Sequence, residues 1–130
     1  MAHGQSEAVL KPPQGRRDVT AVAEASDGQL LARFAACRDE FGEIAFEPLV
    51  RRHGPMVLRV CHQVLGDRHT AEDAFQATFL ILARRAGSIR RPELLGHWLY
   101  GVALRTAREA RIRGERSSRH RQKIRASSSR

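Results

Sequence analysis

Two sets of side chains between Thr70 and Arg108 have types and spacings that can do chemistry at a surface. The segment TAEDAFQATFLILARR carries Asp73 and Gln76 three positions apart, so a carboxylate and an amide share one side of a helix. Together they present adjacent hydrogen-bond acceptors and donors to one partner surface. The segment HWLYGVALRTAR then sets the only Trp and the only Tyr of the chain among arginines. The first set predicts a contact with a protein, and the second a contact with exposed nucleobases.

Four amphipathic helices are predicted to position these side chains. The first begins at Asp27, a good N-cap, and buries the apolar positions of GQLLARFAACRDE. The second covers about residues 44–65, where we expect a kink near Gly54-Pro55 or a break there, Pro48 in the first turn, and an end at Gly66-Asp67. Its predicted apolar stripe consists of Phe46, Leu49, Val50, Val57, Leu58, Cys61 and Leu65.

The third and fourth helices carry the candidate residues. Thr70 is the expected N-cap of the third, with Asp73 completing an acidic capping box, and Arg84-Arg85 suit its C-terminal end. The fourth begins after Pro92 and runs to about Arg113. The apolar positions of both helices point to a core, and they are Ala71, Phe75, Thr78, Phe79, Leu82, Leu95, Trp98, Leu99, Val102 and Thr106. With no strand pattern and no repeat, the predicted fold is all-α, a small bundle of about four helices.

Charge and composition define three parts of the chain. Residues 1–26 have the composition of a disordered leader, residues 27–113 of a helical domain, and residues 114–130 of a disordered basic tail. The formal charge of the 130 residues is +9, and from Arg105 onward ten Lys and Arg stand against Glu109 and Glu115. This concentration fits either a polyanion-binding surface or a solubilising tail.

Several classes of protein are not supported by the sequence. There is no apolar run of about 18 residues and no secretory h-region, so we expect a cytoplasmic protein without a membrane contact. Cys37 and Cys61 lie among apolar neighbours, which predicts two buried thiols rather than a disulfide. The six histidines form no metal-binding motif, and no phosphate-binding or nucleophile motif occurs. We therefore expect no enzyme activity, no metal and no cofactor.

Four strings in order resemble region 2 of bacterial extracytoplasmic-function sigma factors. They are DGQLLARF, AFEPLVRRHGPMVLRVC, LGDRHTAEDAFQATFLILARR and RRPELLGHWLYGVALRTA, and they span roughly residues 27–113. The resemblance implies a helical domain that binds RNA polymerase core and melts promoter DNA. A complete member has a second, helix-turn-helix domain called region 4. Because no apolar period follows Arg113, we expect this chain to be a region 2 module alone.

The resemblance implies roles for particular residues. Asp73 and Gln76, with Ala77 and Leu80 on the same face, would contact the clamp helices of the polymerase β′ subunit. Many relatives have an acidic residue where this chain has Ala77, so one polar contact is missing. An anti-sigma factor is a further expected partner. For Asp73, helix capping is the alternative role.

The resemblance also implies that the segment from Ser88 to Arg108 recognises the single-stranded −10 element of a promoter. We expect its base pocket between the RRPELLG loop and the start of the Trp98 helix. The candidate DNA contacts are Arg90, Arg91, His97, Trp98, Tyr100, Arg105 and Arg108.

Alternatives exist for several of these residues and for the whole chain. Trp98 fits core packing, Tyr100 an ordinary surface position, and Arg84 and Arg85 the neutralisation of a helix end. Relatives often have Asn in place of Arg105, which favours a phosphate contact there over a base contact. The chain itself could be a stand-alone interaction module, such as a decoy for an anti-sigma factor or polymerase, or a non-specific nucleic-acid-binding helical protein.

Overall fold

The computed structural model describes residues 24–37 and 40–128, and within these ranges it contains four α-helices and no strand. The helices are α3 (Asp27–Ala36), α4 (Glu40–Leu65), α5 (Arg68–Arg85) and α6 (Leu95–Ser128), with two short 3₁₀ turns, η1 (Ala86–Ser88) and η2 (Pro92–Leu94), between α5 and α6. The predicted all-α bundle is confirmed. The leader expected over residues 1–26 lies outside the described residues up to position 23.

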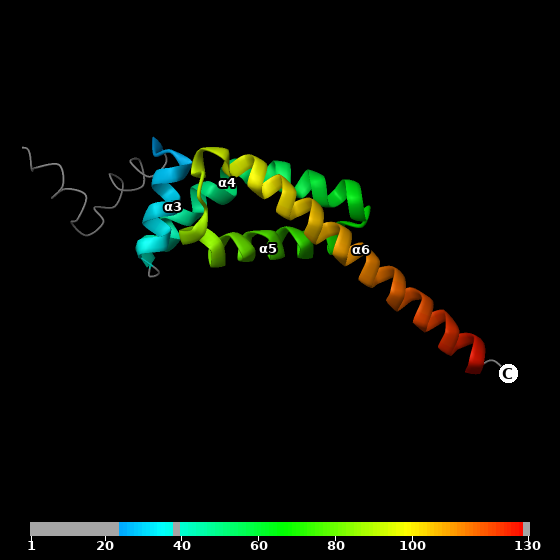
Figure 1. Ribbon diagram of the computed structural model, residues 1–130. Helices are drawn as coiled ribbons and strands as arrows, with labels where there is room; N and C mark the ends of the chain where they lie inside the picture. The colour runs from blue at the N-terminus through cyan, green and yellow to red at the C-terminus, as the bar shows by residue number, and fades with distance from the viewer. Residues whose placement is uncertain (1–23, 38–39, 129–130) are drawn as a thin grey trace, which may run out of the picture.

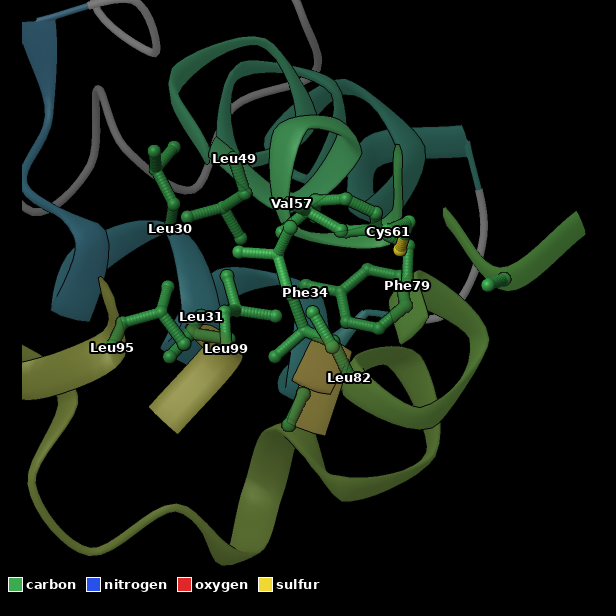
Figure 2. Close-up of a cluster of buried hydrophobic side chains, with 14 of the residues drawn as sticks. Leu30, Leu31, Phe34, Leu49, Val57, Cys61, Phe79, Leu82, Leu95 and Leu99 are labelled. Atoms are coloured by element: carbon green, nitrogen blue, oxygen red, sulfur yellow. The ribbon is translucent and has the colours of Figure 1, made fainter. Parts of the chain in front are cut away.

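Helix α4 is the centre of the bundle, packed against α3, α5 and α6, while α3 lies across one end (Figure 1). Figure 2 shows how apolar side chains from all four helices meet between them. Leu49, Leu82, Leu95 and Leu99 are completely buried there. About half of the positions expected from the helical period are buried in this core. The others are half-buried, and they are Phe46, Val50, Leu58, Leu65, Phe75, Trp98 and Thr106.

Helix α4 differs from its prediction in length and in continuity. It begins at Glu40, so Pro48 is its ninth residue and not part of the first turn. It also runs through Pro55 as one helix, so the alternative of a break into two helices does not hold. Each proline removes one backbone donor, but burial of residues such as Leu49 and Val57 against three other helices outweighs that loss. The helix ends as predicted, at Gly66, whose φ of 74° is readily adopted only by glycine.

The N-cap of α3 is Ser26 and not Asp27 as predicted. The Ser26 hydroxyl accepts a hydrogen bond from the Gln29 amide, and the Gln29 side chain accepts one from the Ser26 amide, which forms a capping box. Asp27 is instead bound to α4: its carboxylate lies 2.8 Å from His53 Nε2 and 3.1 Å from an Arg52 guanidinium nitrogen. The first helix is thus tied to the bundle by polar contacts as well as by its buried leucines.

Helix α6 continues far beyond the predicted end near Arg113. It is one helix to Ser128, so residues 114–128, which we expected to be disordered, are helical in the structure. At 1.5 Å per residue its 34 residues extend over about 51 Å. Figure 1 shows the last turns projecting past the ends of α4 and α5. All side chains from Arg111 to Ser127 are exposed, so no core contact supports this part. Its local support comes from residues with high helix propensity and from an Arg111–Glu115 ion pair of 3.4 Å.

Candidate interaction surfaces

The start of α5 is fixed by Asp67, one turn earlier than predicted. The Asp67 carboxylate accepts hydrogen bonds from the backbone N–H of Thr70 at 2.9 Å and from the Thr70 hydroxyl at 3.0 Å. Both hydrogen bonds lower the pKa of the Asp67 carboxyl, and the bond from the Thr70 backbone has the larger effect. Thr70 therefore donates to the cap and is not the cap itself. The predicted capping box of Thr70 with Asp73 is wrong, because the helix already begins at Arg68.

This shift in the helix start removes the capping role from Asp73. The side chain lies in the second turn of α5 and is exposed. Among the described residues, no hydrogen bond or ion pair engages the side chain of Asp73 or of Gln76. The neighbouring carboxylate of Glu72, in contrast, is paired with Arg68 at 3.2 Å. Asp73 thus keeps its hydrogen-bonding capacity for groups outside the bundle.

Asp73, Gln76, Ala77 and Leu80 form what we call the α5 outer face. Asp73 and Gln76 are exposed, Ala77 is half-buried, and Leu80 is 58% exposed although it is a large apolar side chain. The opposite side of α5 is fixed in the core by Ala71, Ala74, Thr78 and Leu82. Thr78 is buried, and its hydroxyl has a hydrogen-bond partner there because it donates to the Ala74 carbonyl oxygen at 2.8 Å. The outer face is therefore a small mixed surface on a rigid support.

The loop residues predicted to touch DNA are exposed. Arg90 and Arg91 lie between the two 3₁₀ turns, and His97 lies in the first turn of α6. Arg91 is paired with Glu93 at 3.2 Å. The pKa of the Glu93 carboxyl is lowered, chiefly by a hydrogen bond to its own backbone and then by Arg91. Glu93 therefore partly neutralises the charge of Arg91, whereas Arg90 forms no ion pair with Glu93.

A cleft lies between the C-terminal half of α5 and the middle of α6. Its volume is about 360 Å³. Its lining combines three arginines, one tryptophan and one carboxylate with smaller side chains, and consists of Ile81, Arg84, Arg85, Trp98, Val102, Arg105, Thr106 and Glu109. We call it the α5–α6 cleft. The base pocket expected between the RRPELLG loop and the start of the Trp98 helix stays a prediction.

The α5–α6 cleft brings together only part of the predicted DNA-binding set. Trp98 and Arg105 line it, whereas Arg108 is exposed outside its lining and Tyr100 is 50% exposed. Trp98 is half-buried against the core and also faces the cleft, so packing and exposure coexist at this side chain. Arg84 and Arg85 were interpreted from the sequence as charges at a helix end. Arg84 and Arg85 follow Leu80 and Ile81 by one helical turn, so they share a face with them. This spacing was the feature of the sequence that could have indicated a surface role.

Other chemistry has little support in the described residues. Within residues 24–37 and 40–128 no group of three or more His, Cys, Asp or Glu side chains could hold a metal ion. Cys61 is buried, and burial raises the pKa of its thiol, but Cys37 is only half-buried where we expected a buried thiol. None of the helices described here is long and apolar enough to cross a membrane.

A comparison with protein families matches residues 49–117 to sigma-70 region 2. The matched part covers more than half of the chain and includes the α5 outer face, the loop and the α5–α6 cleft. The chain therefore belongs to the sigma-70 region 2 family. A search of solved structures found no match. Region 2 is a non-catalytic domain of transcription initiation factors, and membership in the family implies RNA polymerase core and promoter DNA as partners.

Proposed function

We propose that this chain acts as the region 2 module of an extracytoplasmic-function type sigma factor, with the α5 outer face as its contact with the β′ clamp helices. The observation that carries the proposal is the position of Asp73. The carboxylate is exposed, unpaired within the described residues and no longer needed as a cap, since Asp67 performs that task. Gln76 and Leu80 extend the same surface with an amide and an apolar side chain.

A carboxylate, an amide and an exposed leucine suit a helical partner. A charge-assisted hydrogen bond from a partner Arg or Lys to Asp73 is worth about 1.5–3 kcal/mol. Gln76 can donate and accept at once, which favours one orientation of the partner. Burial of Leu80 adds an apolar contact at the centre of a polar rim. Because Ala74, Thr78 and Leu82 hold α5 from behind, binding requires little ordering of this surface.

For the DNA side of the proposal, we infer that the loop and the first turns of α6 bind the single-stranded −10 element. Exposed Arg90, Arg91 and His97 supply donors for phosphates, and Tyr100 supplies an exposed ring on which a base can stack. The α5–α6 cleft adds Arg105 for a phosphate and the edge of Trp98 for a base. Because its lining combines the edge of Trp98 with three arginines, we infer that this cleft accommodates a flipped base.

The test of the polymerase contact uses a β′ fragment that carries the clamp helices. The Asp73→Ala/Gln76→Ala variant of the full chain is expected to bind it at least about 30-fold more weakly, because two hydrogen bonds, one of them charged, are lost. Glu72→Gln is the matched control, since this residue is also exposed on α5 but already paired with Arg68. Its affinity should stay within about threefold of the unsubstituted chain. Absence of any binding by the unsubstituted chain would overturn the proposal.

A non-specific nucleic-acid-binding protein is the second candidate, and the uneven charge favours it. Arg105 to Arg130 carry ten of the 23 Lys and Arg residues of the chain. Such a protein would show no preference within a randomised single-stranded DNA pool, and its affinity would not depend on Asp73 or Gln76. Clamp binding without a selected single strand would instead indicate a decoy that occupies polymerase without melting DNA.

A further inference from the structure

From Arg105 to its C-terminal end, α6 carries basic side chains on every side, and five of them are aligned along one face. At 100° per residue, five basic side chains fall within an arc of about 80° around the helix axis. We call them the α6 basic stripe, and they are Arg105, Arg108, Arg116, Arg119 and Lys123. All five are exposed. The stripe begins at the α5–α6 cleft, where Arg105 lies with Arg84 and Arg85.

Carboxylates interrupt this face only at its margins. Glu115 is held by Arg111, which lies off the stripe, at 3.4 Å. Glu109 lines the α5–α6 cleft at the other margin. The positive charge of the stripe is therefore directed outward over about 27 Å, the rise of the 18 residue steps from Arg105 to Lys123.

The pattern of apolar residues argues against a membrane or a partner helix as the ligand. The exposed large hydrophobics of this segment are Ile112 and Ile124. Twelve positions separate them, so they lie about 120° apart around the helix and form no apolar stripe. A helix that lies on a membrane or enters a coiled coil needs such a stripe.

The pattern of aromatic residues argues for a double strand over a single strand. After Tyr100 the sequence contains no Phe, Trp or Tyr, so unstacked bases have no ring on which to stack. A duplex offers phosphates at regular intervals and keeps its bases paired. A straight track of about 27 Å is shorter than one turn of B-DNA, which is about 34 Å, so one face of the duplex can follow it.

We propose that the α6 basic stripe binds the phosphates of duplex DNA, independently of sequence, beside the single-stranded segment held by the bundle. The inference rests on the proposed function in one respect, which is that the polymer bound by the stripe is promoter DNA. Arg116, Arg119 and Lys123 then position the duplex, while the loop and the α5–α6 cleft read the melted strand, and Arg105 lies where the two meet. Arg116, Arg119 and Lys123 lie outside all the residues to which we assign −10 recognition, so their contribution can be removed separately.

The experiment compares two triple variants of the full chain with equal charge. Arg116→Gln/Arg119→Gln/Lys123→Gln removes the stripe, and Arg113→Gln/Arg121→Gln/Arg125→Gln removes three charges from the other faces of the same segment. Each change lowers the net charge from +9 by three, to +6. Glutamine keeps a high helix propensity, and circular dichroism checks that both variants retain the helicity of the parent.

Affinity for a fluorescein-labelled DNA duplex of arbitrary sequence is measured by anisotropy over a range of salt. The slope of log affinity against log salt should fall by about 2.7 in the stripe variant, which is about 0.9 for each of three lost phosphate contacts. It should fall by less than about 1 in the control variant. An equal decrease of the slope in both variants would show that the whole segment binds through its net charge, and it would overturn the proposal. An unchanged slope in both variants would also overturn it.

Two further measurements separate this proposal from the proposed function. Binding of the stripe variant to the β′ clamp fragment should be unchanged, because Asp73 and Gln76 are intact. If the unsubstituted chain does not bind the fragment, the proposed function fails while the duplex result stands by itself. Duplex RNA serves as the competitor, and a preference of the stripe for RNA over DNA would overturn the assignment.

Discussion

The α5 outer face and the α6 basic stripe are two exposed surfaces that differ in how they are held and in what they can recognise. The outer face is small and mixed, with one carboxylate, one amide and one leucine, and its helix is fixed in the core by residues such as Leu82. The five side chains of the stripe are all basic, with exposed Ile112 among them, and three of the five lie on helical turns without a core contact. A rigid mixed surface can select one partner orientation, whereas an array of like charges attracts any polyanion. If both proposals hold, selectivity for polymerase is expected on α5 and affinity for duplex DNA on α6.

Salt should separate the two surfaces most strongly. If the five side chains of the stripe each neutralise one phosphate, duplex affinity should fall by about 500-fold between about 50 and 200 mM salt. Affinity for the β′ clamp fragment should fall by no more than a few-fold, because the outer face contributes only the Asp73 charge. Titrations of both ligands at matched salt concentrations measure the two slopes. Equal slopes would remove the distinction between the surfaces.

Two neighbouring leucines of α5 should give opposite results. Leu82→Ala leaves a cavity at a completely buried position and should lower the free energy of unfolding by about 2–5 kcal/mol. Leu80→Ala changes a side chain that is 58% exposed, so its effect on unfolding should stay within about 0.5 kcal/mol. Urea unfolding measures both, and clamp binding by Leu80→Ala should weaken by several-fold. Unaltered clamp binding would remove Leu80 from the proposed contact.

Introducing an acidic residue at position 77 should raise the affinity of the α5 outer face for the β′ clamp fragment. Relatives often have one there, and Ala77 is half-buried beside the exposed Gln76. Ala77→Glu is expected to raise clamp affinity by about threefold to tenfold through one added charge-assisted hydrogen bond. Ala77→Gln, with a similar shape but no charge, is the control. A loss of affinity with both substitutions would indicate that the partner packs closely on the alanine.

The smallest effect concerns the Asp67 cap, which sets the position of the outer face. The pKa of this carboxyl is lowered in the folded chain, so its contribution to stability is present above the unfolded pKa of about 4. The contribution is lost as the pH falls through the lower, folded pKa. Asp67→Ala should therefore be less stable than the parent at neutral pH, with a difference that shrinks below about pH 4. Asp67→Asn keeps a capping oxygen without the charge and should show no such pH dependence. Thermal unfolding of the three proteins across this range measures the effect.

The sequence predicted the fold better than it predicted the ends of the helices. Apolar spacing identified Leu49, Leu82, Leu95 and Leu99 as core because burial of one helix face imposes that period. The capping residues were missed at α3 and α5, since Ser26 competes with Asp27 and Asp67 with Thr70. At α3 the choice depends on Arg52 and His53, 25 and 26 positions away, which occupy the Asp27 carboxylate. No local pattern contains that contact.

The candidate site was predictable only where one helix carries it. Asp73, Gln76, Ala77 and Leu80 share a face by helical spacing alone, and the structure exposes that face. The α5–α6 cleft depends on packing that brings Arg84 and Arg105 to one opening across 21 positions. The extension of α6 was missed for a different reason. Apolar periodicity reports only helices that enter a core, and residues 111–127 are exposed on every side.

Nuclear magnetic resonance of the full chain, titrated with the β′ clamp-helix fragment, tests the central claim most directly. Backbone amide shifts are expected to change first and most at Asp73, Gln76, Ala77 and Leu80, with the α6 basic stripe unaffected. Saturating changes confined to the loop and α6, with α5 unperturbed, would contradict that claim.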